Sequence, residues 1–259
     1  MPARVIYSIL PGRYGNEAMI DRLRAIYQRE MMTPSPLAIF INPFFLLRRA
    51  LLVHLRKTLS GIKGRRVLDV GCGSKPYEAL FDVEDYVGTD IEKSGHDHAS
   101  SRVDVFYDGK TLPAENGSVD IVFSSEVFEH VFGLDDLLDE IHRVLQDDGM
   151  LVFTAPFIWG EHEQPYDYAR YTQFAWADLL DRHGFDLVER VKTTGDIETI
   201  FQLLASYIHQ GVLPNNRLVR LVLTPFLIAP VSLIGFLLAR ILPDTGTLYA
   251  NNIIVARKT

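Results

Sequence analysis

The chain has 259 residues, of which 47% are hydrophobic and 23% are charged, and its formal net charge is −7. This length fits one large domain or a domain with an appendage, and this composition excludes a wholly disordered chain. A single cysteine excludes a disulfide framework and a cysteine-based zinc site, and is typical of a reducing compartment. The first twenty residues lack an apolar stretch ending in a small-residue cleavage site, so we expect no secretory signal.

Charge is distributed unevenly along the chain. Residues 1–66 carry a net charge of +9, residues 67–195 one of −18, and residues 196–259 one of +2. The basic residues of the two ends alternate with bulky aliphatic residues and lack a base-reading or stacking pattern. We therefore expect an anionic lipid surface, and not nucleic acid, as a partner of the ends.

The N-terminal part contains a predicted basic amphipathic helix. Residues 36–46 are strongly apolar and lead into Leu47, Leu51 and Leu55 at helical spacing, with arginines and lysines on the other faces. One interpretation is that residues 36–57 contact a membrane surface. The alternative is a helix that packs on the main domain and leaves its charges in solvent.

Strands and helices alternate from about residue 65. This alternation predicts an α/β fold with a doubly wound, mostly parallel sheet. Ligands of such sheets bind at the carboxyl ends of the strands, so we expect the site in the loops after Val70, Thr89, Phe106 and Phe123. The predicted strands are 65–70, 85–91, 103–107, 119–125, 150–157, 185–193 and 251–257, and the predicted helices are 134–145 and 172–182.

A glycine-rich turn follows the first predicted strand. Gly71 and Gly73 allow the backbone to turn sharply and to approach a ligand closely. A dinucleotide fingerprint would require a third glycine at position 76, where Pro76 has no N–H to donate to a phosphate. Together with Asp69 ahead of the turn, this pattern favours a cationic ligand, and an NAD-linked oxidoreductase is the weakest alternative. Cys72 is interpreted as a small packing residue.

Two more acidic residues end the second and third strands. Asp90 is placed to accept hydrogen bonds from both hydroxyls of a ribose. Asp108, followed by Gly109, is suited to accept from the amino group of adenine. Each acid alone has an ordinary interpretation as a strand-end or loop carboxylate, but their order and spacing together indicate a nucleoside ligand.

These motifs, with VDIVFSSEVFEHV at 119–131, resemble the class I S-adenosylmethionine-dependent methyltransferases of the small-molecule branch. The resemblance covers about residues 64–195 and the last strand. It implies a seven-stranded sheet whose last strand is antiparallel, and S-adenosylmethionine as cofactor. Lys75 departs from the family, where a further small residue is frequent, so the detailed shape of the loop is not implied. The cofactor-binding residues that the resemblance implies are Asp69, Gly71, Gly73, Asp90, Ile91, Asp108, Gly109 and Ser125.

The segment after the fourth strand carries Glu126, Glu129 and His130. It is similar to the matching string of quinone O-methyltransferases, which implies a general base or a hard-metal site. The alternative, which we prefer, is that the string shapes the pocket and caps the following segment. We therefore assign no metal ligands, leave open whether a divalent metal is needed, and retain His130 as a catalytic candidate.

Residues 156–172 form a polar, aromatic loop after the fifth strand. The loop resembles a HE-x-P-x-D-x-x-R-x-T stretch of methyltransferases encoded among polysaccharide-assembly enzymes. His162 is our first candidate for a general base, because an imidazole can take a proton near pH 7. Tyr168, Arg170 and Tyr171 are interpreted equally well as structural residues that tie the loop to the sheet. The predicted acceptor-side residues are Glu126, Trp159, Glu163, Tyr168, Arg170 and Tyr171.

Residues 221–239 contain no charged side chain and, as a helix, would be about as long as a bilayer core is thick. Pro225, Pro230 and Gly235 argue against one straight helix. A single span would also place the last two strands on opposite sides of a membrane. We therefore predict two or three helices over 197–242, broken near 211–216 and 225–230, on a membrane surface. The alternatives are a lid or a dimer interface.

The predicted parts are a helical extension (1–63), a cofactor-binding core (64–195), an apolar helical insert (196–245) and the last core strand (246–259). We expect methyl transfer to an amphiphilic acceptor, such as a lipid-linked saccharide or a prenylated quinone, in the cytoplasm at the inner membrane face. One alternative is the same reaction on a soluble metabolite with the insert as a lid. Another is a non-catalytic nucleotide-binding protein that acts in assembly. The sequence leaves open the methylated atom and the oligomeric state.

Overall fold

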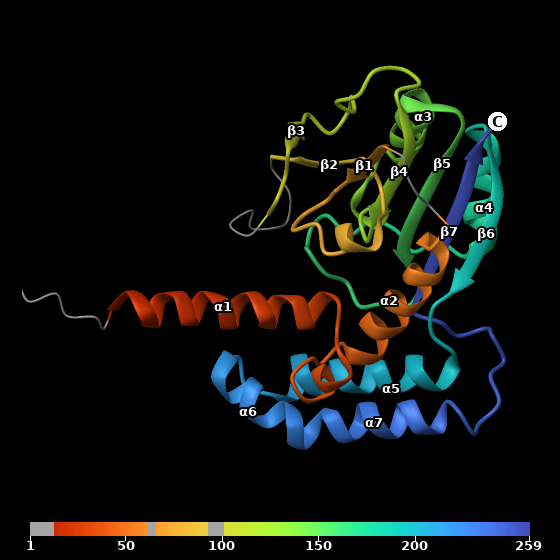
Figure 1. The fold of residues 1–259 in the computed structure, drawn as a ribbon. Helices are drawn as coiled ribbons and strands as arrows, with labels where there is room; N and C mark the ends of the chain where they lie inside the picture. Colours follow the sequence, from red (N-terminus) through yellow and green to blue (C-terminus); the bar gives the residue numbers. More distant parts are fainter. Residues whose placement is uncertain (1–12, 62–65, 93–100) are drawn as a thin grey trace, which may run out of the picture.

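The computed structural model describes residues 13–61, 66–92 and 101–259. Within these residues, seven strands form one sheet in the order β3-β2-β1-β4-β5-β7-β6 (Figure 1). Strands β1 to β5 pair in parallel, whereas β7 runs antiparallel to both β5 and β6. This confirms the predicted doubly wound, mostly parallel sheet. The strands are β1 (Arg66–Val70), β2 (Asp85–Ile91), β3 (Val105–Tyr107), β4 (Val119–Ser125), β5 (Leu145–Pro156), β6 (Phe185–Lys192) and β7 (Asn251–Lys258).

The strand bounds agree with the sequence prediction to within two residues except at β5, which begins at Leu145, five residues earlier than the predicted 150. The reason lies in its pairing with β4, where Val119 pairs with Leu145 but Ile121 pairs with Met150. The intervening residues 146–149 loop out at this irregularity, and Asp148 has a positive φ of 62°. The predicted turn is therefore an interruption near the start of a strand.

Helices cover both faces of the sheet. α3 (Leu134–Val144) and α4 (Gln173–Arg182) cover one face, where Trp176 packs with Phe128 and Phe153. α4 begins as predicted, because the Thr172 side chain accepts a hydrogen bond of 3.2 Å from the N–H of Ala175. α2 (Phe45–Leu59) covers the opposite face.

The apolar side of α2 is buried, which favours the second of the two interpretations given above, a helix that packs on the main domain. Leu51, Leu55 and Leu59 are at most 1% exposed and pack on the sheet, while Arg56 and Lys57 face solvent. The periodicity of α2 thus reflects packing on the main domain, the alternative considered above. The large apolar side chains that remain exposed within 36–57 are Leu37, Phe40 and Val53.

The segment between β6 and β7 folds as α5 (Asp196–Tyr207), a π-helical turn η5 (Ile208–Val212), α6 (Arg217–Leu227) and α7 (Ala229–Leu238). The breaks fall in the two predicted regions. Because Lys192 of β6 pairs with Asn252 of β7, the segment leaves and re-enters the sheet at one edge. That edge also holds the carboxyl ends of β1 to β5. Figure 1 shows α5, α6 and α7 as a layer below it, beside α1 (Arg13–Met32).

This helical layer is fixed to the rest of the protein by specific contacts. A β-carbon at Gly235 would lie 2.4 Å from the Cβ of Phe201, so α7 can approach α5 closely only with glycine there. The buried Gln202 side chain of α5 accepts from the N–H of Leu47 (3.1 Å) and donates to the carbonyl of Pro43 (3.0 Å). These two bonds join the insert to the start of α2.

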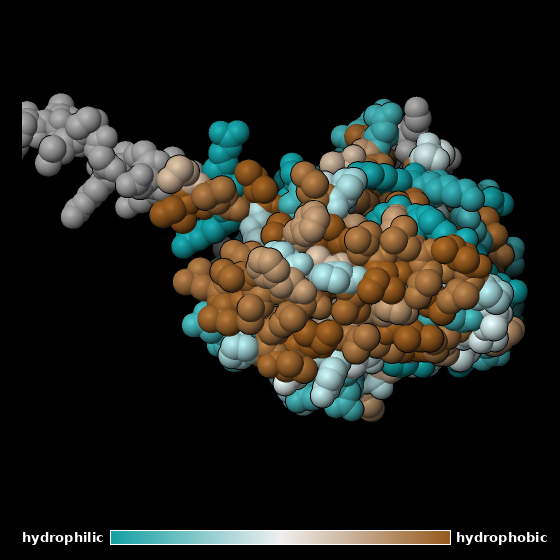
Figure 2. Space-filling view, turned by 90° about the horizontal axis from the view of Figure 1, so that it is seen from below, coloured by the Kyte–Doolittle hydropathy of each residue, from teal (hydrophilic) through white to brown (hydrophobic). Residues whose placement is uncertain are grey.

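The outer surface of the layer is apolar over a wide area (Figure 2). The helical stretch Arg217–Leu238 is, by length and composition alone, long and apolar enough to cross a membrane. Only 28% of its most apolar 18-residue segment is buried within the protein. The core helix of a soluble domain would be mostly covered, so this stretch is not a core helix. The exposed side chains that we call the apolar face are Leu37, Phe40, Ile200, Leu204, Tyr207, Leu218, Val222, Phe226, Leu233, Ile234, Leu237 and Ile241.

Candidate functional site

The loops after β1 and β2 are joined by hydrogen bonds. The N–H groups of Gly71 and Cys72 donate to the carbonyl of Thr89, and the N–H of Gly73 donates to Asp90 Oδ2 over 3.2 Å. Gly71 and Gly73 both have positive φ values, 73° and 47°, which other residues rarely adopt. Glycine is therefore required for the turn that brings the β1 loop to the Asp90 carboxylate.

The loop after β3 contacts the end of β2, close to Asp90. A β-carbon at Gly109 would lie 3.5 Å from Ile91 Cγ2, which puts Gly109 in contact with the end of β2. The neighbouring Asp108 is exposed, and its Oδ1 accepts from the N–H groups of Lys110 and Thr111. These bonds lower the pKa of Asp108, so it is ionised at neutral pH. The predicted residues from three strand ends thus lie together.

Asp69 lies beneath this site instead of at its surface. Its side chain is 3% exposed, and Oδ2 accepts a hydrogen bond of 2.7 Å from the Tyr86 hydroxyl. Burial raises the pKa of Asp69 to about 7. The side chain of this predicted cofactor residue is therefore buried and bonded to β2.

Lys75, which stands where the family often has a small residue, is accommodated by burial and an ion pair. Its side chain is buried, its ammonium group pairs with Asp104, and it lies 5.6 Å from the centre of the Tyr86 ring. Asp104 also accepts from the N–H of Gly88 over 2.7 Å. A β-carbon at Gly88 would lie 2.4 Å from Lys75 Cε, so glycine makes room for the lysine. Asp104 was not predicted, because no motif marks an acid paired across two loops.

Two small side chains near the loop have packing or bridging contacts. Cys72 is buried, and burial raises the pKa of its thiol to about 12, which agrees with its interpretation as a packing residue. Ser125 donates to Thr154 Oγ1 over 2.9 Å, and Thr154 in turn donates to Glu126 Oε1 over 2.7 Å. Ser125 therefore connects the end of β4 to the acidic group that follows it.

Glu126 is held by β7. It has a positive φ of 58°, and Asn251 Nδ2 lies 2.7 and 2.6 Å from its two carboxylate oxygens. Asn251 was not predicted, because it opens a strand 125 residues away and carries no motif of its own. With Thr154 and Asn251 as donors, the Glu126 carboxylate is hydrogen-bonded on both oxygens.

Arg170 and Asp167 form a bidentate ion pair within the loop after β5. The two Arg170 to Asp167 hydrogen bonds measure 2.5 and 2.7 Å, and Asp167 also accepts from the N–H of His162 over 3.0 Å. Burial works against ionisation of Asp167, but these hydrogen bonds outweigh it and hold its pKa at about 2. Arg170 thus has the structural role considered from the sequence, and Asp167 is an additional residue at the site.

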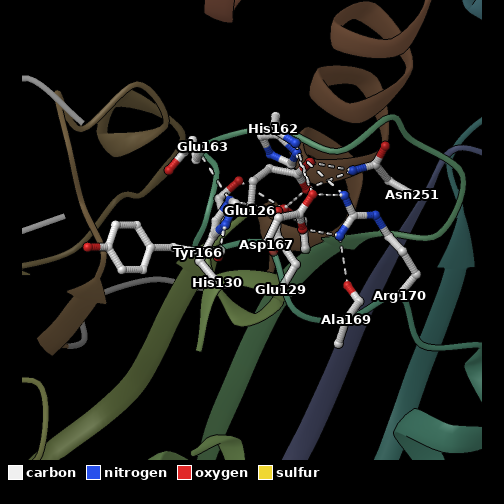
Figure 3. A network of polar contacts seen from close by, with 12 residues as sticks. Glu126, Glu129, His130, His162, Glu163, Tyr166, Asp167, Ala169, Arg170 and Asn251 are labelled. Carbon is white, nitrogen blue, oxygen red and sulfur yellow. Dashed lines mark hydrogen bonds and ion pairs between the residues drawn. The ribbon is translucent and has the colours of Figure 1, made fainter. Parts of the chain in front are cut away.

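The two candidate catalytic histidines are in contact (Figure 3). The rings of His130 and His162 meet edge to face, with 4.7 Å between their centroids. Burial, and next the proximity of His130, lowers the pKa of His162. His162 is therefore neutral at pH 7 and able to accept a proton. Burial, and next the Glu126 carboxylate, raises the pKa of Glu129 well above its ordinary value.

The remaining predicted acceptor-side residues have different surroundings. Tyr168 is 44% exposed and Glu163 lies beside His130, with 3.7 Å between Glu163 Oε1 and His130 Nε2. The ring of Tyr171 packs on Trp176 in the core at 4.8 Å, which matches its structural interpretation. His96 and His98, interpreted from the sequence as solvated, lie outside the described residues.

Trp159 connects this loop to the helical layer. Its ring contacts Phe44 edge to face at 5.7 Å, and Phe44 contacts the His209 ring of the π-helical turn at 5.8 Å. A line of three aromatic rings therefore runs from the predicted acceptor side to the insert.

Comparison with known proteins identifies the class of the core. Residues 68–153 match the family model described as a methyltransferase domain. The chain contains a class I S-adenosylmethionine-dependent methyltransferase domain. It is 27% identical, over an alignment 174 positions long, to a malonyl-[acyl-carrier protein] O-methyltransferase of Legionella pneumophila. The match covers 58% of this chain and 61% of that relative's length.

Solved structures share the fold of this methyltransferase domain. One comes from the complex between the Haloferax volcanii Trm112 methyltransferase activator and a putative methyltransferase, with a TM-score of 0.53, 17% identity, and coverage of 96% of this chain and 99% of the other. Another is phosphoethanolamine N-methyltransferase 2 of Haemonchus contortus in complex with S-adenosyl-L-methionine, with a TM-score of 0.50, 18% identity, and coverage of 88% and 58%. At these identities the likeness shows the fold.

The residues of the methyltransferase domain fit the cofactor of its class, S-adenosylmethionine. A β-carbon at Gly73 would meet no described atom within 4 Å, so the loop faces open space beside the Asp90 carboxylate. Asp90 and the exposed Asp108 provide acceptors for hydroxyl and amino groups. This combination of open space and negative charge suits an adenosyl sulfonium cation.

Proposed function

We propose that this protein transfers the methyl group of S-adenosylmethionine to an amphiphilic acceptor, such as a lipid-linked saccharide or a prenylated quinone, at the cytoplasmic face of a membrane. The observation that carries the proposal is the position of the apolar face. The insert that bears it leaves the sheet at the edge that holds the carboxyl ends of β1 to β5, and the glycine loop, Asp90 and the loop with His162 lie at or after these ends. An acceptor with its tail in lipid would therefore present its polar end to the methyltransferase site.

The charges of the helical layer support binding to an anionic membrane. Arg217 and Arg220 lie at the start of α6, and Arg240 lies just after α7, so cations flank both ends of the apolar stretch. Apolar side chains bordered by arginine are typical of helices that lie in a membrane interface. Because the insert begins and ends on the same sheet edge, we favour a helical hairpin that lies on the membrane over a single span.

The protein's own residues would align the reactants. The bound cofactor supplies a methyl group that its sulfonium already activates. The carboxylate of Asp90 would accept from the ribose hydroxyls, and Asp108 with Gly109 would hold the adenine end. The loop after β5 would cover the acceptor, hold it in line with the methyl group and exclude water, which strengthens the electrostatic interactions within the site.

His162 would remove the proton of an acceptor hydroxyl. Its lowered pKa keeps it neutral at pH 7, and Asp167 lies 3.3 Å from its Nδ1. A carboxylate in this place orients an imidazole and stabilises the imidazolium that forms. His130 would support the ring of His162 by their edge-to-face contact.

Transfer of a labelled methyl group tests the proposed function. The full chain is incubated with S-adenosylmethionine labelled in the methyl group and with either a lipid extract or an aqueous extract of cells. We expect label in the lipid extract. Label only in the aqueous extract would favour a soluble metabolite with the insert as a lid. Donor binding without transfer into either extract would favour a non-catalytic protein.

Asp90→Ala tests the donor site separately. Loss of charged hydrogen bonds costs about 1 to 3 kcal/mol, so we expect the Kd for S-adenosylmethionine and S-adenosylhomocysteine to rise about 5- to 150-fold. Isothermal titration calorimetry measures both affinities. Asp85→Ala, at the other end of β2, is the matched control and should bind both compounds like the unchanged protein. Equal affinity of the Asp90 variant would remove Asp90 from the site.

A further inference from the structure

Three side chains with metal-binding atoms meet at the carboxyl edge of the sheet. Glu129 and His130 come from the short 3-10 helix η4 (Phe128–His130) after β4, and His162 comes from the loop after β5. One ligand atom from each residue lies within 4.8 Å of the other two (Figure 3). The geometry of this group and the surroundings of each member indicate a site that can bind an ion.

Glu129 is the first indication. The residue is 1% exposed, and neither of its carboxyl oxygens has a hydrogen-bond partner among the described residues. Buried carboxyl groups are almost always hydrogen-bonded or paired, because an unpartnered one is costly. Its Oε1 lies 3.7 Å from His130 Nε2, a nitrogen that is likewise buried and has no hydrogen-bond partner in the described chain. Two buried polar groups without hydrogen-bond partners among the described residues, the Glu129 carboxyl and His130 Nε2, thus lie next to each other.

The hydrogen bond of His130 Nδ1 leaves Nε2 available as a metal ligand. Its Nδ1 lies 2.8 Å from the carbonyl oxygen of Tyr166, and since a carbonyl only accepts, the proton must be on Nδ1. In the neutral imidazole Nε2 then carries the lone pair. This nitrogen lies 3.7 Å from both Glu129 Oε1 and Glu163 Oε1. Metal-bound histidines almost always donate their other N–H to a carbonyl or a carboxylate in this way.

His162 has the same kind of outer contact. Its Nδ1 lies 3.3 Å from Asp167 Oδ2 and 3.3 Å from the carbonyl of Gly160, and slightly farther, 3.4 Å, from Arg170 Nη2. The two acceptors favour a proton on Nδ1, which leaves Nε2 to bind an ion. Asp167 is itself held by two hydrogen bonds from Arg170. This is the carboxylate–histidine–metal arrangement that orients ligands in metalloproteins.

We propose that Glu129, His130 and His162 bind a divalent transition-metal ion, with Glu163 as a fourth ligand. Two imidazoles with carboxylates suit Zn²⁺, Co²⁺, Mn²⁺ or Fe²⁺, whereas Mg²⁺ and Ca²⁺ prefer oxygen ligands alone. Ligand atoms around a tetrahedral ion lie roughly 3.3 Å apart, so small side-chain rotations suffice to close the group. The proposal departs from our preferred interpretation of the sequence, in which this segment only shapes the pocket. It also differs from the ligand set suggested by the sequence, because the carboxylate of Glu126 is occupied by Thr154 and Asn251.

A role for the ion follows if the proposed function holds. An ion here would lower the pKa of an acceptor hydroxyl directly, in place of proton removal by the His162 imidazole. This role rests on the proposed methyl transfer, but binding of the ion does not. Metal binding by the protein without cofactor or acceptor therefore tests the site alone.

Titration with Co²⁺ is the experiment. The full chain is stripped with a chelator, titrated with Co²⁺ while its visible absorption is recorded, and then titrated with Zn²⁺ as competitor. We expect one equivalent of Co²⁺ with the spectrum of a nitrogen- and oxygen-bound ion, displaced by Zn²⁺. His162→Ala and the nearly isosteric Glu129→Gln should each weaken binding about 100-fold or more.

His183→Ala is the matched control. His183 also lies between carboxylates, with Asp139 Oδ1 2.6 Å from Nδ1 and Asp135 Oδ1 2.9 Å from Nε2, so both of its nitrogens are occupied. This variant should bind one equivalent like the unchanged protein. Absence of Co²⁺ binding by the unchanged protein would overturn the proposal, as would full binding by Glu129→Gln. Because donor affinity and methyl transfer are not measured, failure here leaves the proposed function intact.

Discussion

Replacement of Leu218, Val222 and Phe226 together by glutamate is expected to lower binding of the protein to anionic lipid vesicles at least about 100-fold. These side chains lie one helical turn apart on α6 and are 74%, 63% and 72% exposed. Burial of a large apolar side chain contributes about 1.5 to 3 kcal/mol, so the loss of three exceeds a factor of 100 even before the repulsion between glutamate and anionic lipid is added. Flotation with vesicles of phosphatidylglycerol and phosphatidylcholine measures the bound fraction.

A control on another surface separates lipid binding from a general effect of charge. Phe174 of α4 is 69% exposed, and α4 covers a face of the sheet, away from the insert. Phe174→Glu should float with vesicles like the unchanged protein. If the unchanged protein does not float but forms a dimer that the triple variant lacks, the apolar face is a subunit interface. Equal flotation of the triple variant would exclude α6 from the lipid contact.

Asp69→Asn is expected to stabilise the protein above neutral pH by about 2 to 4 kcal/mol. The folded protein holds the pKa of Asp69 at about 7, whereas the ordinary value is 3.8. Between these two values the folded state binds more protons than the unfolded state, so the unfolding free energy falls as pH rises through this window. Above pH 7 the penalty for a buried charge is complete. Asparagine carries no charge and still accepts from the Tyr86 hydroxyl, so it avoids that penalty.

Urea unfolding at pH 5 and pH 8 measures this effect. The gain in unfolding free energy of Asp69→Asn over the unchanged protein should be large at pH 8 and small at pH 5. The control is Asp178→Asn on α4, whose side chain is 76% exposed and should change stability by no more than about 0.5 kcal/mol. A gain of equal size at both pH values would mean that the Asp69 carboxyl is ionised throughout, against the raised pKa.

Much of the core could be predicted from the sequence because its signals are local. β2 and β4 have the predicted bounds, and the apolar residues of β4 end in two serines. Glycines at 71 and 73 and the acid at 90 mark strand ends that a parallel sheet brings to one edge. The seventh strand between β5 and β6 followed from the family resemblance, because nothing in residues 251–257 specifies their neighbours.

The features that were missed depend on contacts between distant segments. Periodicity showed that α2 is amphipathic, but it could not show whether sheet or lipid covers the apolar side. Asn251 holds Glu126 across 125 residues, and Lys75 reaches Asp104 across 29. His130 and His162 are neighbours only because the loop after β5 folds back over the end of β4. Such pairs require the path of the loops, which local propensity does not determine.

The place where the insert joins the sheet has a consequence for how such proteins diversify. Since β6 and β7 are adjacent strands, about 5 Å apart, the 196–250 segment starts and finishes at nearly one point. A segment anchored in this manner can be lengthened, shortened or exchanged without displacing any strand. If the insert receives the acceptor as proposed, exchanging this single module between proteins with the same core is expected to transfer acceptor preference.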